Sequence, residues 1–275
     1  DLNSGRLTAI FPVVHEQSII INEGADLVRM DLLTGMEHWR TPLLPLIERA
    51  GRIGDPIGPT AIAFEDEDVI AWIGYSLEGG TSEVEQMVCL DAETGLERWR
   101  YDLDQTPGIE NPETLYPTGP PVIHEDRVFV IARRESRQGL KSCYLLALDR
   151  EHGTPLYLTY IASTGSQYRD GSLRPLTKPV IDGRNILVST SIGAIASINV
   201  ATGNLNWVQR MDTPVSGTRA LNRIRPYDLH YPVIIGDEII SLSPDYRRIV
   251  RLDRNTGARI ETMEIDGRTE WNDVR

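Results

Sequence analysis

The sequence is poor in cysteine, in long apolar runs and in positive charge. Two cysteines in 275 residues, Cys89 and Cys143, exclude a disulfide-dense scaffold. No apolar run approaches the ~18 residues that a membrane-spanning helix requires, so we predict no membrane span in this segment. Forty acidic against 28 basic residues give a formal net charge of −12. A chain this acidic is poorly suited to nucleic acid or anionic membranes, and we predict neither as a partner.

The residues that usually form metal or catalytic sites are also sparse. The five histidines show no ligand spacing, and no Ser/His/Asp grouping or phosphate-type glycine loop occurs. The acidic run 65–68 resembles a Ca²⁺ ligand set, but we interpret it as a solvated hairpin tip. Cys89 and Cys143 fall on equivalent strands of successive repeats, too far apart for a disulfide, which predicts two free thiols. The sequence thus predicts no catalytic residue, no metal and no cofactor.

What the sequence does contain is a repeat. The stretch MVCLDAETGLERWR at 87–100 recurs, with changes, at 27–40, 145–158, 195–208 and 249–262. The turn glycines of the five copies are 60, 58, 50 and 54 residues apart: Gly35, Gly95, Gly153, Gly203 and Gly257. Self-similarity at such a period is the signature of a repeat architecture.

Each copy encodes a strand, a tight turn and a second strand. The positions one, three and four before the turn Asp (Asn199 in the fourth copy) are apolar, which predicts a strand buried on both faces. In D-x-x-T-G, the Asp side chain can accept backbone hydrogen bonds and the Gly can adopt a positive φ. Four residues after the Gly we expect an aromatic that wedges against a neighbouring repeat, and these structural docking residues are Trp39, Trp99, Tyr157 and Trp207. Glu261 takes this place in the fifth copy and is expected to be exposed.

A second pair of apolar runs precedes each unit, for example PPVIHEDRVFV at 120–130, and most of these pairs begin at a proline. Four antiparallel strands per repeat make one propeller blade, so the fold class is all-β, a β-propeller. We predict one domain over 1–275 with five blades, at about 9–43, 57–103, 117–162, 174–211 and 228–265. We expect these blades to be the N-terminal part of a seven- or eight-bladed propeller.

The recurring [ILV]-x-x-L-D-x-x-T-G-x-x-x-W resembles the repeat of pyrroloquinoline-quinone-type β-propellers. That family includes quinoprotein dehydrogenases, a propeller lipoprotein of outer-membrane assembly machinery, and envelope proteins of planctomycete-type bacteria. The stretch STSIGAIASINVATGNLNWV is most similar to the last group. The resemblance implies an extracytoplasmic location, in the periplasm or cell envelope. The dehydrogenases hold their quinone between a Trp and a disulfide of two adjacent cysteines, beside Ca²⁺, and this chain lacks the adjacent pair.

Loop length is the feature that separates the repeats from one another. Blades two and three carry some eight or nine extra residues, at 75–86 and 133–143, and the linker 216–232 is long and basic. We expect these segments on one rim and the D-x-x-T-G turns, uniform from blade to blade, on the other. The candidate partner face comprises Arg133, Arg134, Arg219, Arg223, Arg225, Tyr227 and His230. Arg and Tyr are favoured at interfaces, although tolerated drift of surface loops explains the lengths equally well.

These observations favour a non-catalytic scaffold that binds a protein or a cell-surface polymer, besides the remaining blades of the same propeller. Two alternatives stay open. One is a fragment of a quinone-dependent dehydrogenase. The other is the sensory ectodomain of a larger receptor or kinase.

Overall fold

The structure, a computed structural model, describes residues 12–24, 26–43, 53–56, 61–77, 83–109, 115–136, 139–165, 176–211, 229–243 and 248–265. These residues form strands, turns and one short 3-10 helix, η1 (Leu103–Gln105). The strands build five antiparallel sheets, one for each sequence repeat, and the prediction of an all-β propeller fold is confirmed. We number the sheets as blades 1–5.

The strands of each blade follow one another in the chain. Blade 1 contains β1 (Val13–His15), β2 (Ser18–Asn22), β3 (Asp26–Asp31) and β4 (Glu37–Pro42). Blade 2 contains β5 (Ile53–Pro56), β6 (Ile62–Glu65), β7 (Asp68–Leu77), β8 (Glu83–Asp91) and β9 (Glu97–Asp102). Blade 3 contains β10 (Leu115–Pro117), β11 (Val122–His124), β12 (Arg127–Glu135), β13 (Lys141–Asp149) and β14 (Pro155–Thr164). Blade 4 contains β16 (Val180–Asp182), β17 (Asn185–Ser189), β18 (Ala194–Asn199) and β19 (Leu205–Arg210). Blade 5 contains β21 (Val233–Ile235), β22 (Glu238–Leu242), β23 (Arg248–Asp253) and β24 (Arg259–Glu264).

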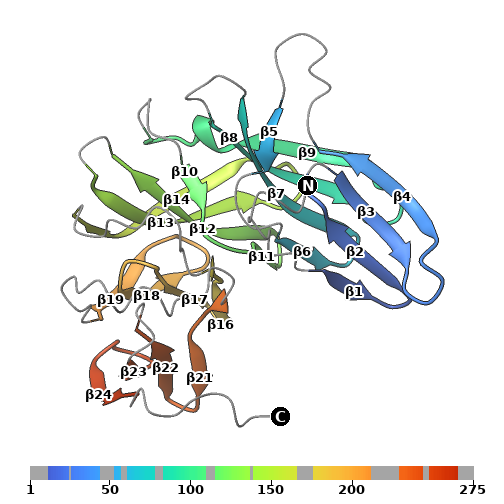
Figure 1. The fold of residues 1–275 in the computed structure, drawn as a ribbon. Helices are drawn as coiled ribbons and strands as arrows, with labels where there is room; N and C mark the ends of the chain where they lie inside the picture. Colours follow the sequence, from blue (N-terminus) through green and yellow to red (C-terminus); the bar gives the residue numbers. More distant parts are fainter. Residues whose placement is uncertain are drawn as a thin grey trace.

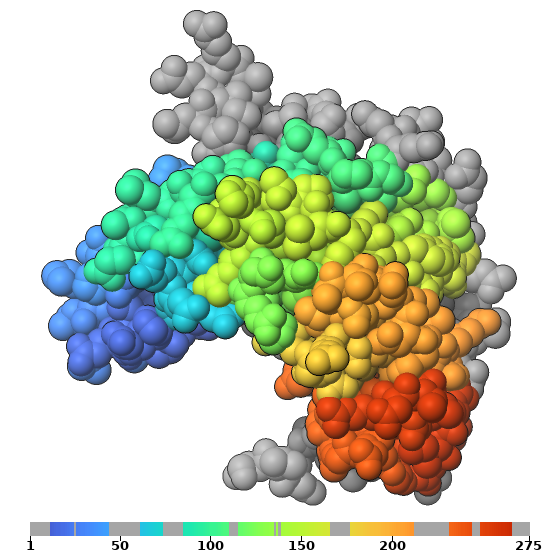
Figure 2. Space-filling view, turned by 180° about the vertical axis from the view of Figure 1, so that it is seen from behind, coloured from blue at the N-terminus to red at the C-terminus, as the bar shows by residue number. Residues whose placement is uncertain are grey.

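The five blades follow one another along an open arc (Figure 1). Seen from behind, the arc runs from blade 1 in blue to blade 5 in red, and these two blades stand well apart (Figure 2). Two short strands, β15 (Leu176–Thr177) and β20 (Leu229–His230), pair in parallel between the linkers that enter blades 4 and 5. Thr177 N also donates to Thr118 O at 2.9 Å, which ties the entry of blade 3 to the same ribbon.

Blades 2 and 3 differ from the predicted four-strand plan because their first strand is in two pieces. Both β5 and β6 pair with β7, and both β10 and β11 pair with β12. In blade 3 the pair Pro120 and Pro121 separates the two pieces. A proline has no N–H to donate to the ladder, so the strand is interrupted there and resumes further on.

The hydrophobic core lies between blades rather than within any one of them. Four clusters of buried side chains fill the four junctions between successive blades. The strand β8 shows how: Val88 and Leu90 pack toward blade 1, while Met87 and Cys89 pack toward blade 3. The strand before D-x-x-T-G is therefore buried on both faces in the inner blades, as the apolar pattern predicts, and Leu90 and Leu148 are fully buried.

The D-x-x-T-G segment closes the turn as its residues predict. In blade 2, Asp91 Oδ1 accepts hydrogen bonds from Thr94 N at 2.8 Å and Thr94 Oγ1 at 2.7 Å, and Gly95 has a φ of +71°. Ala92 N donates to Glu67 O at 2.8 Å, which fastens this turn to the tip of the β6–β7 hairpin. The equivalent bond occurs in all five blades. The tips of the first and last hairpins of every blade thus lie at one end of the sheet, here called the turn rim. The middle hairpin of each blade points to the opposite end, here called the hairpin rim.

Candidate functional site

The predicted aromatics lie at the junctions between blades. Each ring stands over the turn glycine of the next blade, where an added Cβ would overlap it; the pairs are Trp39–Gly95, Trp99–Gly153, Tyr157–Gly203 and Trp207–Gly257. Three of the rings also donate a hydrogen bond to the residue that follows the next turn's Asp or Asn. Trp39 Nε1 donates to Ala92 O at 2.9 Å, Trp99 Nε1 to Arg150 O at 2.7 Å, and Tyr157 Oη to Val200 O at 2.7 Å.

The two ends of this series lack the aromatic contact. Glu261, in the aromatic position of blade 5, is exposed as predicted and accepts a hydrogen bond from Arg251 Nη1 at 2.5 Å. Gly35, the turn glycine of blade 1, has no described atom within 4 Å of an added Cβ, although its φ of +70° matches the others. Gly35 is therefore an internal reference for the glycines that carry a ring.

The sequence led us to expect a turn rim that is uniform from blade to blade, but an arginine bridges the junctions there in two different ways. Where the residue after the turn Asp or Asn is Ala92 or Val200, an arginine of the preceding blade donates to its carbonyl, Arg29 Nη1 at 2.8 Å and Arg127 Nη1 at 2.6 Å. In blades 3 and 5 the residue after the Asp is itself an arginine, and it reaches back to a carboxylate of the preceding blade. The acceptor of the bridging arginine therefore alternates along the arc, a backbone carbonyl at the first and third junctions and a carboxylate at the second and fourth.

The acidic run 65–68 forms the β6–β7 hairpin tip, as predicted, but Asp68 is not solvated. Its side chain is only 9% exposed and lies between two arginines of different blades. Arg98 Nη1 donates to Asp68 Oδ1 at 2.6 Å, and Arg150 Nε donates to Asp68 Oδ2 at 2.6 Å. Arg98 also donates to Asp91 Oδ2 at 2.5 Å. Through these contacts Asp68 acts as an ionic clamp between blades 2 and 3. Among the described residues there is no group of three or more His, Cys, Asp or Glu that could hold a metal ion.

Substituting Asp68 with alanine is expected to lower the free energy of unfolding by about 2–3 kcal/mol, because Arg150 loses its buried counter-charge. The measurement is the midpoint of urea unfolding. Glu67→Ala is the matched control: Glu67 is 81% exposed and lies 3.3 Å from Arg98, so its loss should cost less than about 0.5 kcal/mol. Equal effects of the two substitutions would refute the clamp.

The turn aspartates make the fold sensitive to acid. Hydrogen bonds from the side chain of Arg98 and from Thr94 lower the pKa of Asp91 to about 2. The pKa of Asp31 is lowered chiefly by the Thr34 backbone N–H, and that of Asp253 chiefly by the Thr256 hydroxyl. A carboxyl whose folded pKa lies below its unfolded value of about 3.9 stabilises the fold above that value and loses this effect as pH falls toward 2.

We therefore expect the unfolding midpoint to be constant from pH 7 to about pH 5 and to fall steadily between about pH 4 and pH 2. Asp91→Asn should be less stable than the parent at pH 7 and should lose less of its remaining stability over the acid range. A parent protein whose stability rises or stays level down to pH 2.5 would contradict the assignment.

The candidate partner-face residues differ in how far they are exposed, and four of the seven lie outside the described residues. The segments 75–86 and 133–143, predicted as loops, are mostly strand, because β7 runs to Leu77 and β12 to Glu135. Arg133 therefore lies in a strand opposite Cys143, and it is only 4% exposed, which leaves little of its side chain for a partner. Arg134 is half-buried, and His230 lies in β20. The remaining four, Arg219, Arg223, Arg225 and Tyr227, lie outside the described residues.

The described parts of the two long hairpins do share one rim. The strand β10 pairs with the far end of β12, Tyr116 opposite Arg133, and η1 follows β9 at the corresponding end of blade 2. Tyr101 Oη donates to Thr106 Oγ1 at 2.9 Å and anchors η1 there.

Both cysteines are buried and free, as predicted, and burial raises the pKa of the Cys143 thiol to about 12. These thiols are structural in character.

Five antiparallel sheets, three of four strands and two in which the first strand is split in two, are docked through aromatic-on-glycine contacts. They define the class of protein first: a β-propeller built from repeats of the quinoprotein type. The model of one family, described as outer membrane protein assembly factor BamB, matches residues 27–274, and the chain belongs to that family. A comparison with curated proteins gave no match. No helix in the described residues is long and apolar enough to cross a membrane.

Solved structures with the same fold include a BamB and several dehydrogenases. The structure of BamB from Moraxella catarrhalis is 17% identical with a TM-score of 0.58, over 94% of this chain and 64% of the other. A europium-containing methanol dehydrogenase is 16% identical with a TM-score of 0.59, over 94% and 53%. A quinohemoprotein alcohol dehydrogenase from Comamonas testosteroni is 16% identical with a TM-score of 0.62, over 95% and 43%. At these identities the likeness shows the fold, and this chain spans less than two thirds of each.

Proposed function

We propose that the chain is a non-catalytic binding scaffold of the cell envelope, which binds a protein or a cell-surface polymer through its hairpin rim. The observation that carries this proposal is the unequal height of the blades. The central strands β7, β8, β12 and β13 are nine or ten residues long, whereas β2, β17 and β22 have five. Two adjacent blades thus project on one rim from a rigid, closely packed core. A rigid scaffold with projecting segments is a common way to present a binding surface.

Membership of a family described by an outer membrane assembly factor supports an extracytoplasmic location, in the periplasm or envelope. The finer resemblance, to envelope proteins of planctomycete-type bacteria, stays a prediction from the repeat sequence. We further propose that other blades of the same propeller are partners of this segment, because each similar structure is longer than the part that this chain spans.

Charge complementarity supplies the test of the binding rim. Arg219, Arg223 and Arg225 concentrate positive charge in a chain with a net charge of −12. Replacing all three with alanine should weaken the capture of partners from envelope extract, more so at low than at moderate salt. The control, Arg184→Ala, removes an exposed positive charge from the β16–β17 tip on the turn rim and should leave capture unchanged. Unchanged partners and salt dependence in the first variant would place the binding surface elsewhere.

The dehydrogenases among the similar structures support a second candidate, a fragment of a quinone-dependent enzyme. The residues of this chain do not fit the quinone clamp that the resemblance implies. Cys89 and Cys143 lie on strands of different blades, β8 and β13, and each is a buried free thiol. Trp39 and Trp99 stand over turn glycines and are already engaged in packing.

The direct test is to add pyrroloquinoline quinone and Ca²⁺ to the purified chain. We expect no saturable binding and no dye-linked alcohol oxidation. Turnover above the protein-free reaction would make the enzyme the better proposal. A sensory ectodomain, the third reading of the sequence, would be favoured by a kinase or membrane segment in the full reading frame.

A further inference from the structure

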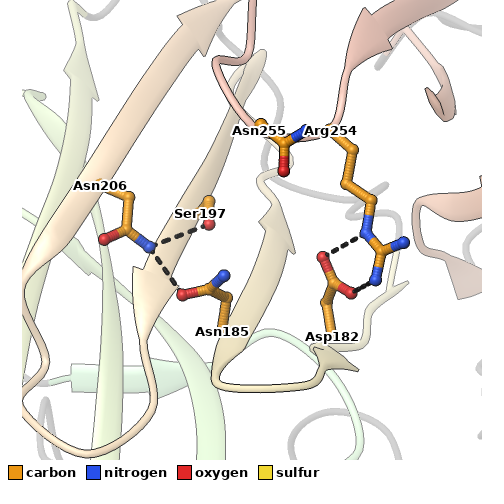
Figure 3. A pocket seen from close by; sticks show the side chains of 6 residues that line it. All are labelled: Asp182, Asn185, Ser197, Asn206, Arg254 and Asn255. Atoms are coloured by element: carbon orange, nitrogen blue, oxygen red, sulfur yellow. Dashed lines mark hydrogen bonds and ion pairs between the residues drawn. The ribbon is translucent and has the colours of Figure 1, made fainter. Parts of the chain in front are cut away.

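A polar cavity lies between blades 4 and 5 on the turn rim, the rim opposite to the one in the proposed function. Its volume is about 340 Å³, at the lower end of the range for small-molecule sites. The lining residues, drawn in Figure 3, are Asp182, Asn185, Ser197, Asn206, Arg254 and Asn255. They come from the β16–β17 hairpin, from β18 and β19 of blade 4, and from the turn of blade 5.

The repeat supplies its own comparison, because a second cavity occupies the equivalent place between blades 2 and 3. There the corresponding positions hold ions: Asp68 where blade 4 has Asn185, Arg98 where it has Asn206, and Glu151 where blade 5 has Asn255. Asp68 and Arg98 pair with each other, so the charged groups that line that cavity are already engaged with one another. Between blades 4 and 5, three neutral amides replace three charges.

The amides leave hydrogen-bonding groups for a ligand. Asn206 Nδ2 donates to Asn185 Oδ1 at 2.9 Å and to Ser197 Oγ at 3.2 Å. These bonds fix both amide planes, as Figure 3 shows. Three groups make no hydrogen bond within the described part of the chain: the donor Asn185 Nδ2, the acceptor Asn206 Oδ1 and the side chain of Asn255. Donors and acceptors are thus interspersed across the lining.

The lining offers no net charge to an ion. Arg254 donates through Nε to Asp182 Oδ2 at 2.9 Å and through Nη2 to Asp182 Oδ1, so the two charges neutralise each other. Asp182 is itself buried, which holds this pair in place. An anion would find no unpaired cation here, and a cation no unpaired carboxylate. Because a hydroxyl group both donates and accepts, it is the ligand group that matches fixed amides of both kinds.

We propose that this cavity is a binding site for a neutral polyhydroxylated ligand, a saccharide unit held by Asn185, Asn206 and Asn255. The site is open to solvent and lacks an aromatic platform among its lining residues, so the affinity for one unit is low, with a Kd on the order of 1–10 mM. A polymer that presents many units to the surface would be retained by repetition rather than by one tight contact.

The experiment uses the full chain and saturation-transfer NMR with maltose, cellobiose and di-N-acetylchitobiose as probes. Asn185→Asp combined with Asn206→Arg rebuilds the salt bridge of the blade 2–3 junction and should weaken binding at least tenfold. Asn204→Asp, an exposed turn residue outside the lining, is the matched control and should bind like the parent. Glucuronate and inorganic phosphate should bind at least tenfold more weakly than the best neutral disaccharide.

Three results would overturn the proposal: no transfer to any of the neutral disaccharides, binding to the Asn185→Asp, Asn206→Arg double variant equal to that of the parent, or stronger binding of the anions. A thermal unfolding curve reports whether the double variant folds, and Asn206→Ala replaces it if it does not. The Arg219, Arg223 and Arg225 triple variant should keep saccharide binding, so failure of the hairpin-rim proposal and failure of this one give different results.

Discussion

Replacing Trp99 with alanine is expected to lower the free energy of unfolding by about 3–5 kcal/mol. The indole is 7% exposed and belongs to the core cluster between blades 2 and 3. It covers Gly153 and donates to Arg150 O at 2.7 Å, so alanine removes buried area, leaves a cavity and strips a carbonyl of its partner. For a chain of this size the melting temperature should fall by about 6–20 °C.

Trp99→Phe separates these contributions. The phenyl ring can still cover Gly153 but cannot donate to Arg150 O. Trp99→Phe should therefore lose about 1 kcal/mol from the missing hydrogen bond, and a further amount because the phenyl ring buries less area than the indole. Trp207→Ala should fall toward the lower end of the range, because the Trp207 side chain is only half-buried. A Trp99→Ala protein that unfolds at the parent's urea midpoint would refute the role of the ring between blades.

The parts of the fold that could be predicted are those set by local sequence. The D-x-x-T-G turn needs one carboxylate or amide oxygen and one residue with positive φ, and both lie within five residues. The two-sided burial of β8 follows from a continuous apolar run. The aromatics could be placed at junctions because their spacing from the glycine repeats, and blade-to-blade contact is the structure that repetition implies.

The charged groups of the turn rim could not be predicted, because their partners come from distant repeats. Asp68 resembled a solvated hairpin residue in its own sequence context, yet Arg150, its partner, lies 82 positions along the chain. A sign was present in retrospect: arginine follows the turn Asp only in blades 3 and 5, where it reaches back. The same comparison of equivalent positions reveals the amide cavity beside Asn185.

Arg133 shows a second limit. Extra residues within a hairpin can extend its loop or its strands, and residue counting does not distinguish the two. Here they extend the strands, with nine pairs between β12 and β13, and Arg133 lies in a run of consecutive buried residues of β12 that begins at Val128. Of the two basic residues that the sequence assigned to the partner face here, Arg133 is thus buried and Arg134 half-buried.

The central claim is that blades dock by placing an aromatic ring on the turn glycine of the next blade, and two glycine substitutions isolate that contact. Gly153 and Gly35 have nearly the same φ, +68° and +70°, so alanine suffers the same backbone strain of about 1–2 kcal/mol at both. They differ in their surroundings: a Cβ at position 153 would overlap the Trp99 ring, whereas at position 35 it meets no described atom.

The most direct measurement is therefore the difference in the free energy of unfolding between Gly153→Ala and Gly35→Ala in one urea series. Forcing a methyl group against the buried ring should make Gly153→Ala about 1–3 kcal/mol more destabilising than Gly35→Ala. Adding Trp99→Ala to both should remove most of that difference, because the methyl group then has room. Equal losses at the two glycines in the parent background, within about 0.5 kcal/mol, would contradict docking through these rings.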